Sequence, residues 1–214
     1  MLKRYEKEGL REGYRLIAGV DEVGRGPLAG PVVASAVLFA SPPDIPGIKD
    51  SKSLRPAQRE ALLLSINREA ITIGVGIVWP SSIDEINIHH ASLLAMERAV
   101  NSLNPLPHLL LIDGPYPIKS PLPQKPIVRG DSLSVSIAAA SIVAKTARDR
   151  VMDAYDTLYP GYGLNRNKGY GTREHREALV RLGSMAIHRK SFRGVKREST
   201  VAHVAYESGR KLSR

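Results

Sequence analysis

Apolar and polar residues are distributed along the first forty residues in a way that predicts two strands. Residues 16–20 form an apolar run that leads into Asp21 and Glu22, and residues 32–39 form a second run that is rich in valine. Runs of this length with β-branched residues are typical of strands. The segment GRGPLAGP lies between the two runs, so we expect an antiparallel pair joined by a glycine- and proline-rich turn.

Beyond residue 40 the pattern switches between the helical period and that of strands. Charged or apolar residues at helical spacing predict helices over residues 3–13, 56–69, 81–103, 134–155 and 172–182. The pattern does not decide whether the third helix is broken near His89. The fourth helix contains Lys145 and Asp149 as an i,i+4 pair. Strands are expected at 71–79, 108–112 and 127–129. Strands that alternate with helices indicate the α/β class, with a mixed β-sheet flanked by helices.

Three segments lack a regular pattern. Prolines and glycines predict loops over residues 43–54 and 115–126, and glycines and tyrosines predict another over 159–172. The tail 196–214 is expected to form a weak basic helix. No linker separates independent units, so we expect one domain over residues 1–214, with a core at about 15–158 and a small C-terminal helical extension at about 159–214.

Composition and charge narrow the class of protein. The chain has 214 residues, of which 43% are hydrophobic and 24% charged, and this mix excludes wholesale disorder. The formal net charge is +10, which favours a polyanionic partner such as nucleic acid. Cysteine is absent, which excludes a disulfide framework, a thiolate zinc site and a cysteine nucleophile.

The sequence also predicts where the protein works. No apolar stretch approaches the ~20 residues that a membrane span needs. The N-terminal segment carries three glutamates and lacks the apolar run of a signal peptide. We therefore expect a cytoplasmic protein with no membrane contact.

Acidic residues follow the predicted strands. Asp21 and Glu22 come after the first strand, Asp113 after the strand at 108–112, and Asp131 after the strand at 127–129. Ligands of open α/β sheets gather at strand ends, and a carboxylate cluster of this kind favours Mg²⁺ or Mn²⁺. The alternative is that each aspartate merely forms a turn. Adjacent strand residues point to opposite faces, so Asp21 and Glu22 share a site only if the strand ends or bulges there.

Gly24, Arg25 and Gly26 form a second candidate site. Together with Ala29 they match a dinucleotide-binding fingerprint, but that motif requires a helix, and a valine-rich strand follows instead. Glycines around an arginine let backbone N–H groups approach a sugar or phosphate; the alternative is a tight hairpin loop with an exposed arginine. Tyr170, between two glycines, is placed to stack on a sugar or base or to pack on its own domain.

Several longer blocks, in order, carry a family resemblance. AGVDEVGRGPLAGPVVASAV, DSKSL, LIDG, GDSLSVSIAAASIVAKTARDR, NKGYGTREHREAL and IHRKSF resemble the corresponding blocks of type 2 ribonucleases H, the bacterial ribonuclease HII family. The resemblance covers roughly residues 15–193. It implies a ribonuclease H-like fold and a hydrolase that cuts the RNA strand of RNA–DNA hybrids and incises duplex DNA 5′ of embedded ribonucleotides.

The resemblance also assigns roles to residues. It implies that Asp21, Glu22, Asp113 and Asp131 are the catalytic residues and hold two divalent ions, Mg²⁺ or Mn²⁺, with Asp21 bridging them. It implies substrate binding by Gly24, Arg25 and Gly26 at the ribose 2′-hydroxyl, by Tyr170 at the RNA–DNA junction, and by Lys52 and Lys145 at the backbone. The expected partners are RNA–DNA hybrids and ribonucleotide-containing duplex DNA, bound by a monomer.

Two other functions compete with this one. A non-catalytic nucleic-acid binding module would use the same basic surface and show salt-dependent binding without turnover. Another metal nuclease of the same fold, such as a recombinase or resolvase, would cut all-DNA substrates or branched junctions. The combination of the GRG segment with Tyr170 argues against the second.

Overall fold

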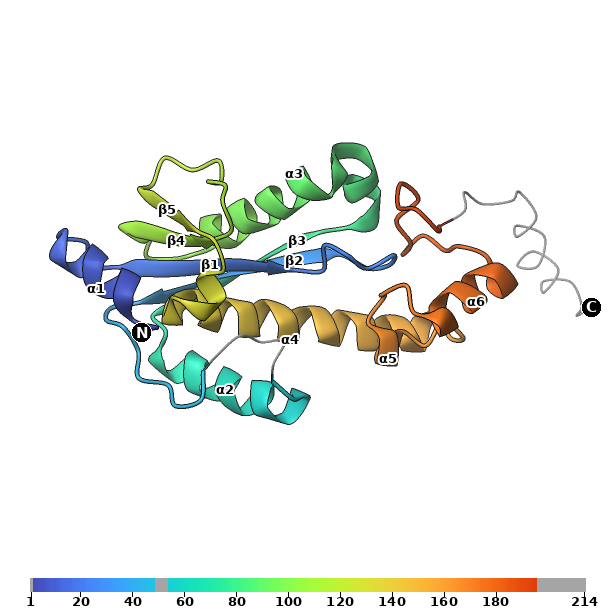
Figure 1. Cartoon of the computed structure of the whole chain (residues 1–214), viewed down its shortest axis with the longest axis horizontal. Helices are drawn as coiled ribbons and strands as arrows, with labels where there is room; N and C mark the ends of the chain where they lie inside the picture. The colour runs from blue at the N-terminus through green and yellow to red at the C-terminus, as the bar shows by residue number, and fades with distance from the viewer. Residues whose placement is uncertain (1, 49–53, 196–214) are drawn as a thin grey trace, which may run out of the picture.

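A five-stranded mixed sheet forms the centre of the computed structural model, which describes residues 2–48 and 54–195 (Figure 1). The strand order is β3-β2-β1-β4-β5. The strands are β1 (Ile17–Val23), β2 (Val32–Phe39), β3 (Thr72–Val78), β4 (Leu109–Asp113) and β5 (Gln124–Ile127). β1, β2 and β3 pair antiparallel, as the sequence predicted for the first two. β4 and β5 add as parallel strands beside β1, so the expected mixed sheet is confirmed.

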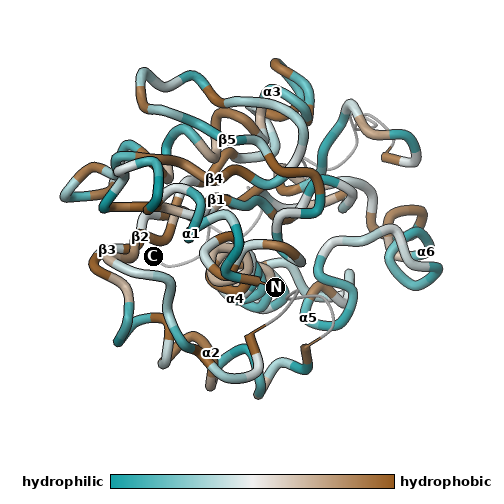
Figure 2. Tube along the Cα trace, turned by 60° about the vertical axis from the view of Figure 1, so that its left-hand side comes forward, coloured by the Kyte–Doolittle hydropathy of each residue, from teal (hydrophilic) through white to brown (hydrophobic). Residues whose placement is uncertain are grey.

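Helices cover both faces of this sheet. The helices of the main layers are α2 (Pro56–Glu69), α3 (Pro80–Asn101) and α4 (Val135–Leu158). α3 lies on one face and α4 on the other, with α2 beyond it (Figure 1). The core divides accordingly, because α3 packs on one set of strand residues, and α2 and α4 pack on the opposite set. Figure 2 shows the hydrophobic stretches gathered along the strands and α4, whereas α6 (Arg173–Leu182) is largely hydrophilic.

A close approach between backbones seats α4 on the sheet. A β-carbon placed on Gly19 of β1 would lie 2.0 Å from the carbonyl carbon of Ser136 and 2.3 Å from the nitrogen of Ile137. Real β-carbons never approach other atoms this closely, so only glycine lets the strand and the helix touch here. The contact holds the first turns of α4 against the middle of β1.

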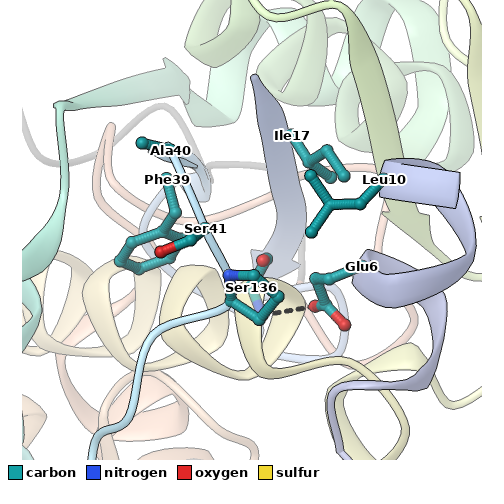
Figure 3. A pocket seen from close by; sticks show the side chains of 8 residues that line it. Glu6, Leu10, Ile17, Phe39, Ala40, Ser41 and Ser136 are labelled. Atoms are coloured by element: carbon teal, nitrogen blue, oxygen red, sulfur yellow. Dashed lines mark hydrogen bonds between the residues drawn. The ribbon is translucent and has the colours of Figure 1, made fainter. Parts of the chain in front are cut away.

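The N-terminal helix α1 (Arg4–Arg11) docks on the beginning of α4. Glu6 is 1% exposed and lines a small cavity, of about 10 Å³, with Leu10, Ile17, Phe39 and Ser136 (Figure 3). One oxygen of Glu6 accepts hydrogen bonds from α4, while its Oε2 and the Oγ of Ser136 have no partner among the described residues. A cavity of this size has room for about one water molecule.

The structure differs from the sequence prediction at several element boundaries. β5 covers Gln124–Ile127 and not 127–129, and the short 3₁₀ turn η2 (Gly130–Ser132) follows it. Pro126 is tolerated because β5 lies at the edge of the sheet. The predicted loop at 159–172 contains the one-turn helix α5 (Leu164–Asn167). The break left open in the third helix occurs at Asn87, whose φ of 66° is not helical.

The described residues contain no helix that is both long and apolar enough to cross a membrane. The predicted loop at 43–54 and the tail at 196–214 lie partly or wholly outside the described residues.

Candidate active site

Asp21 and Glu22 occupy adjacent positions inside β1. The prediction that the strand ends at these residues is wrong, because its ladder with β2 continues to Val23. The parallel ladder with β4 is shorter and stops where Val20 meets Ile112. Beyond that point β4 no longer pairs with β1. The side chains of Asp21 and Glu22, which start from opposite faces of β1, can therefore approach each other past this unpaired edge. This local geometry replaces the bulge that the sequence prediction required.

Asp113, the last residue of β4, completes a cluster of three carboxylates. One oxygen each from Asp21, Glu22 and Asp113 lies within 4.8 Å of the others. The N–H of Gly130 in η2 donates to Oδ1 of Asp113 over 2.6 Å. The hydroxyl of Ser141 in α4 donates to Asp21. The orientation of the cluster is therefore set from both the η2 turn and α4.

Asp131 lies on η2 directly after Gly130, and is half-buried. Its Oδ1 accepts a hydrogen bond from the hydroxyl of Ser132 over 3.3 Å. Among the residues that the structure describes, Asp131 is not one of those whose carboxylate oxygens meet within 4.8 Å. The structure therefore brings together three of the four acidic residues predicted from the sequence and places the fourth on a neighbouring turn.

Burial and mutual repulsion raise the pKa of two clustered carboxyls. Burial raises the pKa of Asp21 well above its usual range, and the charges of Glu22 and Asp113 raise it further. Burial also raises the pKa of Glu22, against the opposing effect of Arg25, whose guanidinium donates to Glu22 Oε1 over 3.2 Å. Negative charges held this close repel one another unless a cation lies among them.

The donor set of this cluster fits a divalent metal ion. Glu22 Oε2 is buried and has no hydrogen-bond partner among residues 2–48 and 54–195, so it keeps its capacity to bind a ligand. All three groups offer carboxylate oxygens, the ligands that Mg²⁺ and Mn²⁺ prefer. Beside the cluster, a pocket of about 100 Å³ is lined by Glu22, Arg25 and Asp113 together with the ring pair His89 and Tyr116.

The turn after β1 is held from behind by two buried arginines. Arg189 donates to the carbonyls of Gly24, Arg25 and Gly30 over 2.6, 3.0 and 3.0 Å. Arg148 of α4 donates to the carbonyls of Pro31, Ala29 and Lys168 over 2.9, 3.1 and 2.9 Å. Both guanidiniums are fully buried. Six backbone carbonyls thus bind two arginines, and the segment 24–31 is fixed relative to α4 and to the C-terminal part of the chain.

The GRG residues and Tyr170 lie side by side. Tyr170 is 43% exposed, and its Cε1 is 3.6 Å from where a β-carbon on Gly26 would lie. The N–H of Leu28 donates to the carbonyl of Gly169 over 2.8 Å. Within the described residues the N–H groups of Arg25 and Gly26 have no protein acceptor. The loop therefore offers backbone donors and an exposed aromatic ring next to the carboxylates.

Of the two lysines predicted to bind substrate, the structure describes Lys145 and not Lys52. Lys145 lies one helical turn after Ser141 on α4, and its Nζ donates to Oδ1 of Asp149 over 2.6 Å, as the i,i+4 spacing predicted. Asp149 also accepts from Arg59 over 2.9 Å, so Lys145 is part of a half-buried ion-pair network. Lys52 lies outside the described residues.

Sequence reasoning missed the residues that support the site. Ser141 sits in an alanine-rich helix, and Arg189 belongs to the IHRKSF block, whose residues carry no predicted role. An arginine in a basic chain is expected on the surface, so no local pattern signals that Arg189 is fully buried. Only the three-dimensional path of the chain shows what it binds.

Carboxylates that cluster on two adjacent strands of a helix-covered mixed sheet agree with the class expected from the sequence, a nuclease with the ribonuclease H-like fold. The family model for ribonuclease HII matches residues 18–195. The chain therefore belongs to the ribonuclease HII family, whose members are endonucleases that act on the RNA of RNA–DNA hybrids.

Individual relatives agree with this assignment. The ribonuclease HII of Syntrophomonas wolfei is 53% identical over 195 residues, which cover 91% of this chain and 76% of the relative. That of Geobacter sulfurreducens is 53% identical over 192 residues, covering 90% and 88%. Both similarities extend over nearly the whole described chain.

Solved structures show the same fold. Ribonuclease H2 from Pyrococcus horikoshii superposes with a TM-score of 0.71 at 27% identity, over 84% of this chain and 95% of that one. The ribonuclease HII solved in complex with PCNA from Archaeoglobus fulgidus gives a TM-score of 0.72 at 25% identity, over 87% and 98%. The expected ribonuclease H-like fold is thereby confirmed.

Proposed function

We propose that this enzyme cuts the RNA strand of RNA–DNA hybrids and also incises duplex DNA on the 5′ side of a single embedded ribonucleotide. The observation that carries the proposal is the position of the GRG loop, which begins two residues after Glu22 and adjoins the exposed ring of Tyr170. A site that recognises a single ribose needs few contacts, provided that they lie beside the reacting phosphate.

The carboxylates hold the metal ions in this proposal. Asp21, Glu22 and Asp113 form the carboxylate cluster, and Asp131 joins from the η2 turn that also orients Asp113. Two bound Mg²⁺ or Mn²⁺ ions would activate a water molecule and stabilise the leaving oxygen. Asp21 is the most buried of these carboxyls, and we assign it the position between the two ions. The products are a 3′-hydroxyl and a 5′-phosphate.

The GRG loop recognises the ribose in this proposal. The 2′-hydroxyl is both donor and acceptor, and it is the group that distinguishes RNA from DNA. The N–H groups of Arg25 and Gly26 supply donors, and Arg189 keeps the loop rigid by binding the carbonyls on its other side. Because these contacts are backbone groups that read a sugar, we expect weak dependence on base sequence.

The first experiment uses end-labelled duplex DNA that contains one ribonucleotide. We expect a single cut 5′ of the ribonucleotide with Mg²⁺ or Mn²⁺, no cut with chelator, and no cut in an all-DNA duplex. Asp21→Asn should abolish cleavage and keep most of the binding. Binding without cleavage in either metal would favour the binding module, and cleavage of the all-DNA control or of a branched junction would favour another nuclease of this fold.

Tyr170 is tested separately. Tyr170→Ala should lower kcat/KM at a single ribonucleotide about tenfold, the loss expected for one stacking contact, and change cleavage within a long hybrid much less. Tyr170→Phe keeps the ring and should retain the wild-type preference. Equal losses by Tyr170→Ala on the two substrates would remove Tyr170 from junction recognition.

The remaining parts of the proposal concern assembly and setting. We assign the enzyme to the cytoplasm, which suits a cysteine-free chain, and take it to bind its duplex as a monomer. Lys52 and Lys145 are proposed to contact the substrate backbone. Sedimentation of the enzyme with and without duplex distinguishes a 1:1 complex from a dimeric one.

A further inference from the structure

Two buried histidines face each other behind the loop that carries Tyr170. His175 in α6 is 0% exposed and His188, in the segment after α6, is 1% exposed. Their Nε2 atoms are 3.2 Å apart. Neither belongs to the carboxylate cluster.

The hydrogen-bond partners assign one tautomer to each ring. The N–H of Met185 donates to Nδ1 of His188 over 3.0 Å, so a neutral His188 carries its proton on Nε2 and donates to His175. Nε2 of His175 then accepts, which places the proton of His175 on Nδ1. That nitrogen lies 2.9 Å from the carbonyl of Tyr170 and donates to it. The donors run in one direction, from Met185 through His188 and His175 to the backbone of Tyr170.

The far end of this chain of hydrogen bonds joins the GRG loop. His188 forms a β-bridge with Ala29, and the N–H of Arg189 donates to the carbonyl of Leu28 over 2.8 Å. The guanidinium of Arg189 holds the carbonyls of Gly24 and Arg25. The histidine pair therefore connects the support of the GRG loop to the backbone of the tyrosine beside it.

Burial explains why the pair consists of neutral rings. Arg148 from α4 and Arg189 next to His188 are both fully buried, and the exposed side of α6 contributes Glu174. Burial lowers the pKa of His175, and lowers that of His188 to about 4, with His175 contributing. A third buried cation would add repulsion, whereas a neutral imidazole pair supplies a polar connection without charge.

We propose that His188 and His175 are positioning residues, a relay of two neutral rings that fixes Tyr170 against the GRG loop in the geometry that reads a single ribonucleotide. The relay touches no substrate and acts through the carbonyl of Tyr170. The inference rests on the proposed role of Tyr170 in junction recognition and extends it to residues that lie behind the site.

The kinetic test measures the ratio of kcat/KM on a single-ribonucleotide duplex to kcat/KM on a long hybrid. The carbonyl of Tyr170 accepts from Nδ1 of His175 and also from the N–H of Thr172, over 2.8 Å. His175→Leu removes the side-chain donor of these two and should lower this ratio at least fivefold. His175→Asn keeps an N–H at the position of Nδ1 and should restore most of it. In the double variant His175→Leu/Tyr170→Ala the ratio should be no lower than in Tyr170→Ala alone, because the relay acts only through Tyr170.

A matched control separates positioning from general stability. Tyr162→Phe removes a hydrogen bond to the carbonyl of Gly183 over 2.9 Å but keeps the ring that packs on the histidines. It should destabilise the same part of the chain and leave the ratio unchanged. Any loss of activity in this control should be equal on the two substrates. If His175→Leu also lowers both activities equally, the relay is merely structural and the inference is overturned.

A spectroscopic test needs no substrate. Long-range ¹H–¹⁵N spectra of the imidazoles at neutral pH should show His175 as the Nδ1–H tautomer and His188 as the Nε2–H tautomer, with assignments from His175→Asn and His188→Asn. The reverse tautomers, or a charged ring, would contradict the relay. If Tyr170→Ala leaves the kinetic ratio unchanged, the role of Tyr170 fails and the relay fails with it. If Tyr170→Ala lowers the ratio and His175→Leu does not, only the relay fails.

Discussion

The hydroxyl of Ser134 donates to Oε1 of Glu6 over 2.5 Å, and the N–H of Ser136 donates to the same oxygen over 2.9 Å. Ser134 is the N-cap of α4, and its Oγ in turn accepts from Ile137. The carboxylate of α1 therefore lies at the positively polarised N-terminus of α4, where negative charge is stabilising. Since α4 follows η2 directly, this contact also fixes the turn that carries Asp131 and Gly130.

Removal of the Glu6 carboxylate should destabilise the protein. We expect Glu6→Ala to lower the free energy of unfolding by about 2–3 kcal/mol, because it leaves the Ser134 O–H and the Ser136 N–H without their acceptor in a buried site. Glu6→Gln keeps an acceptor oxygen and should cost about 1 kcal/mol. Urea unfolding measures both, with the exposed Glu12→Ala as control. A Glu6→Ala midpoint equal to that of Glu12→Ala would show that the cap contributes nothing.

Removal of the Asp21 charge should stabilise the protein in the absence of metal, whereas removal of the Glu6 charge destabilises it. Its folded-state pKa is raised by burial and by its acidic neighbours, so its ionised form costs stability as pH rises through that pKa. In chelator at neutral pH, Asp21→Asn should therefore be more stable than the wild type, by about 1–2 kcal/mol.

Metal addition tests the same cluster in the other direction. Mg²⁺ or Mn²⁺ should raise the melting temperature of the wild type, since a ligand that binds the folded state stabilises it, and should raise that of Asp21→Asn much less. Thermal unfolding with and without metal gives both values. A variant that is less stable than the wild type in chelator would contradict the picture of repelling carboxylates.

Gly24 should tolerate no side chain. Its φ is +96°, and a β-carbon there would lie 2.3 Å from Nε of Arg148 and 2.8 Å from the carbonyl of Pro31. Gly47 has a similar φ of +81° but no atom within 4 Å of its β-carbon position. Gly47→Ala should cost about 1 kcal/mol for backbone strain alone. Gly24→Ala adds the clash and should cost about 3 kcal/mol or more, and it should abolish single-ribonucleotide cleavage. Equal unfolding midpoints for the two variants would refute the clash.

The sequence predicted most of the fold because its elements are long and their periods clear. The helices on both sheet faces and the antiparallel pair at the start of the chain follow from hydrophobic spacing alone. The boundary of β5 was wrong because a strand that contains Pro126 has the composition of a loop. Only its position at the sheet edge, a tertiary feature, makes that strand possible.

The site was partly predictable for a related reason. The family motifs name the four acidic residues, and three of them meet in the structure. How Asp21 and Glu22 share one space was not predictable, because it depends on where the β1–β4 ladder stops. The support by Arg189 joins segments about 165 residues apart, and no local pattern reports a contact of that range.

The buried histidines should make stability fall in mild acid. The folded-state pKa of His188 is lowered to about 4, below that of a histidine in the unfolded chain. The unfolded chain therefore takes up the proton first, and the contribution of neutral His188 is complete above pH ~6.5 and is lost as pH falls toward 4. For this nearly fully buried ring the loss amounts to about 3 kcal/mol at most. The raised pKa values of Asp21 and Glu22 act in the opposite direction.

A difference measurement isolates the histidine. His188→Asn keeps an acceptor for the Met185 N–H and has no group that titrates between pH 4 and 7. The free energy of unfolding, measured by urea titration from pH 4 to 7.5 in chelator, should fall more steeply with acid in the wild type than in His188→Asn. The exposed His90→Asn variant should follow the wild type, because it leaves both buried histidines, His175 and His188, unchanged. Parallel curves for the wild type and His188→Asn would mean that His188 is not held neutral by burial.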